Sequence, residues 1–92
     1  MIKSIKHKGL KKLFETGSVK GVRVDHVTRL RNRLAVLDAA ITLDFIAAQN
    51  WGLHALSGDK KGQYAIKVSG NWRLFFTFED SNVYLLDYDD YH

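Results

Sequence analysis

The sequence lacks cysteine and proline, and it contains no long uninterrupted run of apolar residues. Without cysteine, disulfide frameworks and thiolate zinc sites are excluded. Without proline, the boundaries between helices and strands are expected at glycine and asparagine. Because nowhere do about 18 apolar residues follow one another, no membrane-spanning helix is expected, and the charged start at residues 1–8 does not suit a signal peptide. We therefore expect a cytoplasmic protein with no membrane partner.

A chain of 92 residues is expected to form one domain, spanning positions 1–92. Hydrophobic residues make up 46% of it and charged residues 26%, which is ordinary globular composition and argues against disorder. The net charge of +4 is unevenly distributed: up to Arg33 there are ten Lys or Arg against two acidic residues, whereas from Glu79 onward there are five acidic residues and no Lys or Arg. This asymmetry favours a basic half that faces a polyanion and a separate acidic edge, formed by the residues from Glu79 onward, with solvated helix faces as the simpler alternative.

Apolar residues at helical spacing mark the first half of the chain. The clearest predicted helix has a continuous apolar stripe, made by Val27, Leu30, Leu34, Leu37 and Ile41. Asp25 is its candidate N-cap, and Arg33 is one of the arginines expected to project from the rest of its surface. Shorter helices are predicted around residues 10–14, before a loop at 17–21, and from residue 42, a threonine cap, to about 48.

The second half has the pattern of strands. Four short runs rich in β-branched and aromatic residues are separated by turn compositions, at residues 53–56, 64–68, 72–78 and 83–88. In the third run an apolar face alternates with a mixed face that carries Arg73, Phe75 and Thr77, which is typical of a central strand covered by helices on one side. Ile2 and Ile5 suit a short additional strand. Hairpin-length connections predict a mainly antiparallel sheet, so the expected fold class is α+β, with two or three N-terminal helices packed on that sheet.

Familiar catalytic motifs are missing: the sequence has no phosphate-binding glycine loop, no zinc-protease helix, no nucleophile elbow and no dinucleotide fingerprint. Four histidines remain. His7 and His26 lie among charged residues and are expected to face solvent. His54 lies within an apolar run, where a partly buried structural role is the simpler alternative to catalysis. His92 follows a predicted strand and a neighbouring aspartate and tyrosine.

The residues Asp90-Tyr91-His92 gain a use in the chemistry of RNA cleavage. If the strand stays extended, Asp90 and His92 point to one side with Cα atoms about 6.6 Å apart, and Tyr91 faces the other way. RNA carries its own nucleophile, the 2′-hydroxyl, so the protein needs only a base, an acid and cations. An imidazole, with an ordinary pKa of about 6.5, can act as acid or base. Arg73 offers a fork suited to phosphate, with a salt bridge to the acidic edge as the alternative. This scheme needs no metal ion and no other cofactor.

With these residues in place, the chain resembles the HigB toxins of the RelE-like superfamily, which belong to bacterial type II toxin–antitoxin modules. The resemblance runs from end to end. It is carried by Met1-Ile2-Lys3-Ser4 with His7-Lys8-Gly9-Leu10, by Leu53-His54 with Leu56 and Gly58-Asp59, by Asn71-Trp72-Arg73, and by Tyr88 with Asp90-Tyr91-His92. Each segment alone is modest, but their order and spacing together are specific.

The resemblance implies a microbial-ribonuclease-like fold and a ribosome-dependent endoribonuclease that cuts messenger RNA in the decoding site of the 70S ribosome. The catalytic residues that it implies are His54, Asp90, Tyr91 and His92. The substrate contacts expected beside them are Arg73, near the scissile phosphate, and Asn71, Lys60 and Lys61. It also implies a HigA-like helix-turn-helix antitoxin as partner, through which alone operator DNA would be bound.

The sequence departs from this pattern after His54. Many relatives have proline and then lysine where this chain has Ala55 and Ser57, so a phosphate contact is lost. Lys60 or Lys61 in the next turn could replace it; otherwise weaker cleavage is expected. Two other functions therefore stay open. One is a module that binds RNA or the ribosome without cutting, and the other is a purely protein-binding domain whose uneven charge serves solubility and a partner.

Overall fold

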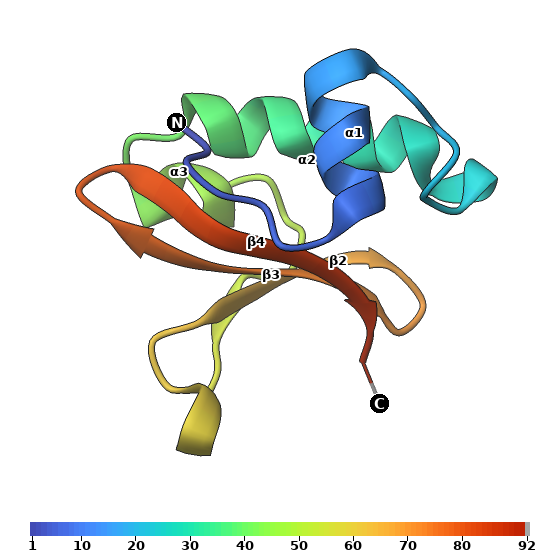
Figure 1. Cartoon of the computed structure of the whole chain (residues 1–92). Helices are drawn as coiled ribbons and strands as arrows, with labels where there is room; N and C mark the ends of the chain where they lie inside the picture. Colours follow the sequence, from blue (N-terminus) through green and yellow to red (C-terminus); the bar gives the residue numbers. More distant parts are fainter. Residues whose placement is uncertain (92) are drawn as a thin grey trace.

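In the computed structural model of the chain, which describes residues 1–91, four strands form one sheet with every pair of neighbours antiparallel. The strands lie in chain order, β1 (His54–Ala55), β2 (Tyr64–Ser69), β3 (Trp72–Glu79) and β4 (Asn82–Asp90). Three α-helices, α1 (Lys8–Thr16), α2 (Val27–Ala39) and α3 (Leu43–Ala47), lie on one side of this sheet (Figure 1). The predicted α+β class and the mainly antiparallel sheet are confirmed.

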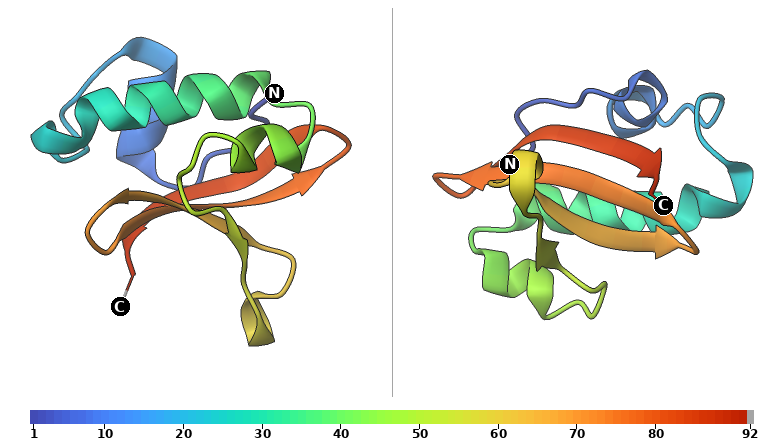
Figure 2. Two further views of the ribbon diagram at one scale, coloured as in Figure 1. Left: turned by 180° about the vertical axis from the view of Figure 1, so that it is seen from behind. Right: turned by 90° about the horizontal axis from the view of Figure 1, so that it is seen from below.

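In the view from below, one face of the sheet is turned toward the reader and α2 passes behind it (Figure 2). Buried side chains fill the space between the helices and the covered face, among them Leu10, Leu34, Leu74 and Phe76. Burying such side chains stabilises the fold by about 1.5–3 kcal/mol each, so this layer holds the sheet in place. The other face, which we call the open face, has no helix over it. None of the helices among residues 1–91 is long and apolar enough to cross a membrane.

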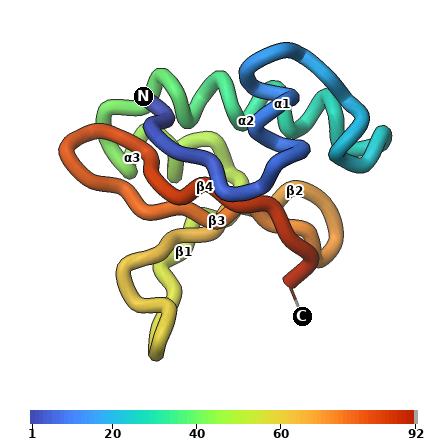
Figure 3. The backbone as a smooth tube through the Cα atoms, in the orientation of Figure 1, coloured from blue at the N-terminus to red at the C-terminus, as the bar shows by residue number. Residues whose placement is uncertain are grey.

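The open face is bordered by two projections on the side away from the helices. One is the segment around the short 3-10 turn η2 (Gly58–Lys60), which links β1 to β2, and the other is the end of β4 (Figure 3). β1 is only two residues long, shorter than the predicted run at 53–56. The expected first strand is reduced to two isolated parallel bridges, which join Ile2 and Ile5 to β4.

Helix α1 begins and ends at residues that satisfy its free backbone groups. The Nδ1 atom of His7 accepts a hydrogen bond from the backbone N–H of Leu10 at 3.0 Å. Gly17, at φ 79°, ends the helix in the left-handed conformation and donates its N–H to the carbonyl of Leu13. His7 is therefore half-buried and structural, not the solvent-facing residue that its charged neighbours suggested.

Two predictions about α2 are wrong. Asp25 does not cap the helix, because the chain first tightens into a 3-10 turn, η1 (Val24–His26), in which Asp25 pairs with Arg23 at 3.2 Å. Ile41, placed in the apolar stripe, lies beyond the end of the helix and is 70% exposed. Leu30, Leu34 and Leu37 of the stripe belong to the buried core, as expected.

Arg33 was also predicted wrongly, since it is buried rather than projecting into solvent. Its Nε donates to the carbonyl of Lys67 in β2 at 2.8 Å, and its guanidinium carbon lies 4.5 Å from the centre of the Trp51 ring. A buried guanidinium needs such partners, because an unpaired buried charge is costly. Arg33 thus joins α2 to the sheet and is not part of a surface that faces a polyanion.

Candidate active site on the open face of the sheet

The sheet register places His54 and Arg73 on the open face. Ala65 pairs with His54 on one side and with Phe75 on the other, and Phe75 pairs with Asp87. Directly opposite residues share a face, so these residues form one row across the sheet. With strands about 4.8 Å apart, the Cα of His54 lies about 10 Å from that of Phe75. Arg73, two residues before Phe75 in β3, lies on the same face.

A β-bulge in β4 decides which acidic residues join this face. Between the pairs Phe75–Asp87 and Thr77–Tyr84, β4 has one residue more than β3. Leu85 is at the bulge, with φ 55°, and its backbone N–H donates to Ser4 Oγ at 2.8 Å. The bulge shifts the alternation of β4, so Val83 and Leu86 both face the core. Asp87 and Asp89 consequently lie on the open face.

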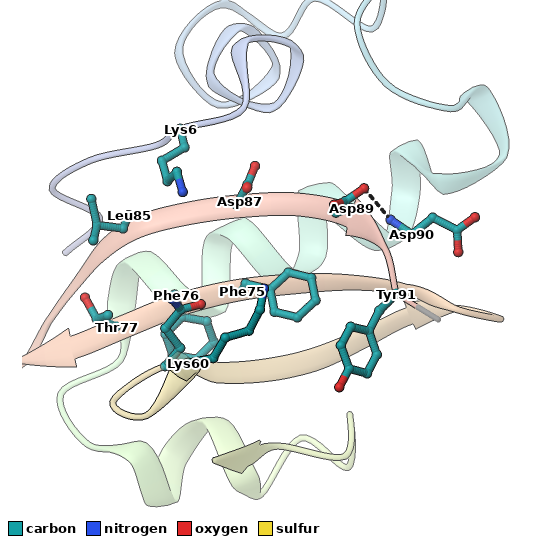
Figure 4. A pocket seen from close by; sticks show the side chains of 11 residues that line it. Lys6, Lys60, Phe75, Phe76, Thr77, Leu85, Asp87, Asp89, Asp90 and Tyr91 are labelled. Carbon is teal, nitrogen blue, oxygen red and sulfur yellow. Dashed lines mark hydrogen bonds between the residues drawn. The ribbon is translucent and has the colours of Figure 1, made fainter. Parts of the chain in front are cut away.

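A cavity of about 400 Å³ opens on this face (Figure 4). Its lining comes from β3, β4, the end of η2 with the segment after it, the residue following β4 and the N-terminal segment. The lining residues are Lys6, Lys60, Gln63, Phe75, Phe76, Thr77, Leu85, Asp87, Asp89, Asp90 and Tyr91. The structure thus brings Lys60, Asp90 and Tyr91 of the predicted site together. His54, Arg73 and Asn71 lie outside the lining, as does Lys61.

Aromatic and basic groups meet over β3. The ring of Tyr91 is tilted by 60° against that of Phe75, with 5.7 Å between their centres. The ammonium of Lys60 lies 5.9 Å from the centre of the Phe75 ring. The expectation that Tyr91 faces away from Asp90 agrees with Figure 4, in which the Asp90 side chain extends away from the Tyr91 ring.

Arg73 is held by the turn that precedes it. Its Nη1 donates to the carbonyl of Gly70 at 2.6 Å and to that of Trp72 at 3.1 Å. The one ion pair within residues 1–91 is Arg23–Asp25, so the alternative of a salt bridge between Arg73 and the acidic edge is not found there. Asn71, in the same turn, accepts a hydrogen bond from the backbone N–H of Tyr91 at 2.8 Å through its carbonyl.

His54 is exposed, which removes the alternative of a buried structural role. Its Nδ1 lies 3.1 Å from the carbonyl oxygen of Gly52. A carbonyl oxygen only accepts, so Nδ1 must carry the proton in this hydrogen bond. In the neutral ring the lone pair is then on Nε2, and this atom is the one that can accept a proton.

Asp90 ends β4 on the other side of the strand. It pairs with Trp72, whose ring packs 4.7 Å from that of Tyr88, so Asp90 stands next to the covered face at the edge of the cavity. Its backbone N–H donates to Asp89 Oδ1 at 2.8 Å. His92 lies outside the described residues, so the predicted alignment of Asp90 with His92 stays a prediction.

His26 was expected to face solvent, and this is wrong: only 2% of it is exposed. Its Nδ1 lies 2.6 Å from the hydroxyl of Tyr88, and its ring packs edge-on against Trp72. Burial lowers the pKa of His26 below its ordinary value and raises that of Tyr88. These rings pack against the end of β4 on the covered face and are not part of the cavity lining.

Several residues of the cavity were not predicted as parts of the site, among them Lys6, Gln63, Asp87 and Asp89. Phe75 and Thr77 could have been found, because they alternate with Arg73 along a predicted strand and so share its face. Asp87 and Asp89 could not be placed in this way, since the bulge at Leu85 changes the face on which they lie.

Comparison with known proteins identifies the family of the chain. A family model described as RelE-like toxin of type II toxin-antitoxin system HigB matches residues 3–92. The chain is also 46% identical over 92 residues to Endoribonuclease HigB of Proteus vulgaris, with all of both chains covered. The resemblance seen in the sequence is therefore confirmed, and it extends over the whole of the fold described above. This chain belongs to the HigB family of RelE-like toxins of type II toxin–antitoxin systems.

Proposed function

We propose that this toxin is an endoribonuclease that cuts messenger RNA on the ribosome, in the decoding site, and that the open face of its sheet is the active site. The relative from Proteus vulgaris is named an endoribonuclease and matches the full chain. The single observation that carries the proposal is the arrangement on one face of a histidine with a defined tautomer, a guanidinium, and an aromatic cavity.

The proposed first step is removal of a proton from the 2′-hydroxyl of the RNA. His54 suits this step, because its Nδ1–H is held by the carbonyl of Gly52 and its Nε2 lone pair is exposed. The freed oxygen attacks the adjacent phosphorus, and a 2′,3′-cyclic phosphate forms as the bond to the 5′-oxygen breaks. A general acid must then give a proton to that 5′-oxygen. We assign this role to His92, oriented by Asp90.

Two cations are proposed to stabilise the negative charge that develops on the phosphorane. Arg73 presents a guanidinium that the carbonyl of Gly70 fixes in place, and preorganised donors of this kind are effective because they need no rearrangement during the reaction. Lys60 lines the cavity, with its ammonium near the Phe75 ring. Tyr91 and Phe75 would stack on a nucleotide, which is worth about 1–3 kcal/mol for each base.

Membership of a type II toxin–antitoxin family implies an antitoxin as partner. We propose that this antitoxin is a HigA-like helix-turn-helix protein, and that the toxin reaches operator DNA only through it. The 70S ribosome and messenger RNA are the other proposed partners. The basic first half of the chain supports this, since phosphate contacts dominate the affinity of proteins for RNA.

A second candidate function is inhibition by binding without cleavage. The observation that favours it is Ser57, an exposed residue without a charge at the start of η2, where the resemblance to the family implies a lysine. The two functions differ in what the site variants do. An enzyme loses toxicity with His54→Gln or His92→Gln, whereas a binder that blocks the ribosome keeps it.

The test combines the purified chain with ribosomes that carry a defined messenger, and maps the 5′ ends of the fragments. We expect cuts at fixed positions relative to the codons, and a loss of about 100-fold or more in His54→Gln and His92→Gln, since general acid–base catalysis contributes about 10²–10⁴-fold. Intact messenger with the wild-type chain, together with growth arrest that survives both substitutions, would show that the chain binds without cutting.

A further inference from the structure

The cavity contains two acceptor oxygens that the proposed reaction does not use. Asp87 and Asp89 each accept the backbone N–H of the next residue through Oδ1, at 3.0 Å and 2.8 Å. These hydrogen bonds orient both carboxylates. Within residues 1–91 the Oδ2 atom of each has no hydrogen-bond partner. Two residues apart on an extended strand, the carboxylates stand about 6.6 Å from each other, at Cα, along one wall of the cavity.

Next to this wall lies a surface for a flat ring. Phe75 is 8% exposed and forms the base of the cavity together with Tyr91, whose tilted ring is 44% exposed and accessible to a ligand. Aromatic side chains in this arrangement stack on nucleobases, whatever the base. The volume of about 400 Å³ falls within the range of roughly 300–1,000 Å³ that small-molecule sites occupy.

The acceptor oxygens of this wall favour a base over a phosphate. Asp87 and Asp89 are the two carboxylates of β4 that lie on the open face and line the cavity. Carboxylates accept hydrogen bonds and donate none, so they repel phosphate oxygens and attract N–H groups. The phosphate is better placed at the rim, where Arg73 lies.

The acceptors also discriminate among the bases. Adenine, cytosine and guanine carry an exocyclic amino group on the Watson–Crick edge, whereas uracil presents one N–H between two carbonyl oxygens. Those carbonyls would face carboxylate oxygens, lone pair against lone pair. We propose that this cavity is a nucleobase pocket in which Asp87 and Asp89 select an amino-bearing base over uracil. The proposal deepens, and rests on, the proposed ribonuclease function of the same face.

Cytidine and uridine 3′-monophosphates are the probes, because they have the same size. The cytosine ring carries an amino group at the position where uracil carries a carbonyl oxygen. The full chain is titrated with each in the presence of EDTA, and the ring signals of Phe75 and Tyr91 are followed by NMR. We expect the cytidine nucleotide to bind at least about tenfold more tightly, because a hydrogen bond to a charged group is lost with uridine. Asp87→Asn, which adds a donor, should bring the two affinities within about twofold.

Asp80→Asn is the matched control: it changes the net charge equally in the exposed β3–β4 turn, at a left-handed position that asparagine tolerates. It should keep the wild-type preference. Equal binding of the two nucleotides by the wild-type chain overturns the proposal, and so does the absence of ring shifts at millimolar concentration. Loss of the preference in Asp80→Asn would also overturn it, since total charge would then be the cause.

Cleavage of a messenger by the same preparations separates this proposal from the proposed function. Cutting without any preference between the two nucleotides would refute the pocket and leave the ribonuclease standing. Preference in binding with no cutting would refute the ribonuclease and leave a base-selective binding site.

Discussion

At the scale of single residues, the structure offers a replacement for the charge that is missing at Ser57. Lys60 lines the cavity with its ammonium over the Phe75 ring, whereas its neighbour Lys61 does not line the cavity. Both belong to the segment between β1 and β2 and both are exposed. Comparing variants at the two lysines therefore distinguishes the effect of a charge inside the cavity from the effect of a charge anywhere on this segment.

We predict that Lys60→Ala lowers messenger cleavage by about tenfold or more, because a charge-assisted contact to the phosphate contributes about 1.5–3 kcal/mol. Lys61→Ala removes the same charge and should change the rate less than about twofold. Initial rates on programmed ribosomes measure both. Equal losses in the two variants would mean that only the net charge of the segment matters.

At the scale of elements, the packing of α1 depends on two glycines. A Cβ built on Gly9, in the first turn of α1, would lie 2.1 Å from the carbonyl oxygen of Gly21, in the loop before η1. A Cβ on Gly21 would lie 2.4 Å from the Cα of Gly9. Backbone atoms block both positions, so the close approach of helix and loop needs glycine at each.

Gly9→Ala consequently should destabilise the protein by about 1–3 kcal/mol, the usual cost of overpacking. Helix propensity alone predicts the opposite sign, since alanine is favoured over glycine by about 1 kcal/mol. Urea denaturation followed by circular dichroism gives the free energy of unfolding. Lys12→Ala, an exposed position in the same helix, is the control and should be nearly neutral. A Gly9→Ala variant as stable as the wild type would contradict the close contact.

The elements also show what the sequence could and could not predict. The alternation along β3 was sufficient to place Arg73 and Phe75 on one face, because a regular strand has a period of two. The same rule applied to β4 fails: Val83 and Asp87 would share a face without the bulge at Leu85, and no local signal marks a leucine for φ 55°.

The burial of two basic residues was not predictable from the sequence for a similar reason. His26 and Arg33 stand among charged neighbours in the sequence, which suggested solvent exposure. Their burial depends on partners far along the chain, Tyr88 for His26 and the carbonyl of Lys67 for Arg33. No local pattern contains such tertiary contacts. For the site, the resemblance of the whole chain to a family pointed to Lys60 and Tyr91, and both line the cavity. The roles predicted for them and for His54 stay predictions.

At the scale of the whole molecule, His26 joins the helical layer to the sheet and makes stability depend on pH. Its folded-state pKa lies below the ordinary value because burial disfavours the charged ring. The unfolded chain therefore binds more protons as the pH falls below about 6.5, and stability is lost over that range. Above about pH 6.5 both states are neutral at this residue and its contribution is fully present.

We predict a lower free energy of unfolding at about pH 5.5 than at about pH 7.5 for the wild-type chain, and a smaller difference for His26→Gln. His54→Gln, at an exposed histidine, should keep the wild-type difference. Urea denaturation at the two pH values measures it. If His26→Gln and His54→Gln depend on pH as the wild type does, the acid sensitivity comes from other groups.

The central claim is that the open face cuts RNA by attack of the 2′-hydroxyl. It is tested most directly with a messenger that carries a single 2′-deoxynucleotide at the main cut position, on ribosomes incubated with the wild-type chain. The account predicts that cleavage there disappears while the other cuts persist, and that fragments of the unmodified messenger end in a 2′,3′-cyclic phosphate. Cutting at the 2′-deoxynucleotide, or fragments that end in a free 3′-hydroxyl, would contradict it.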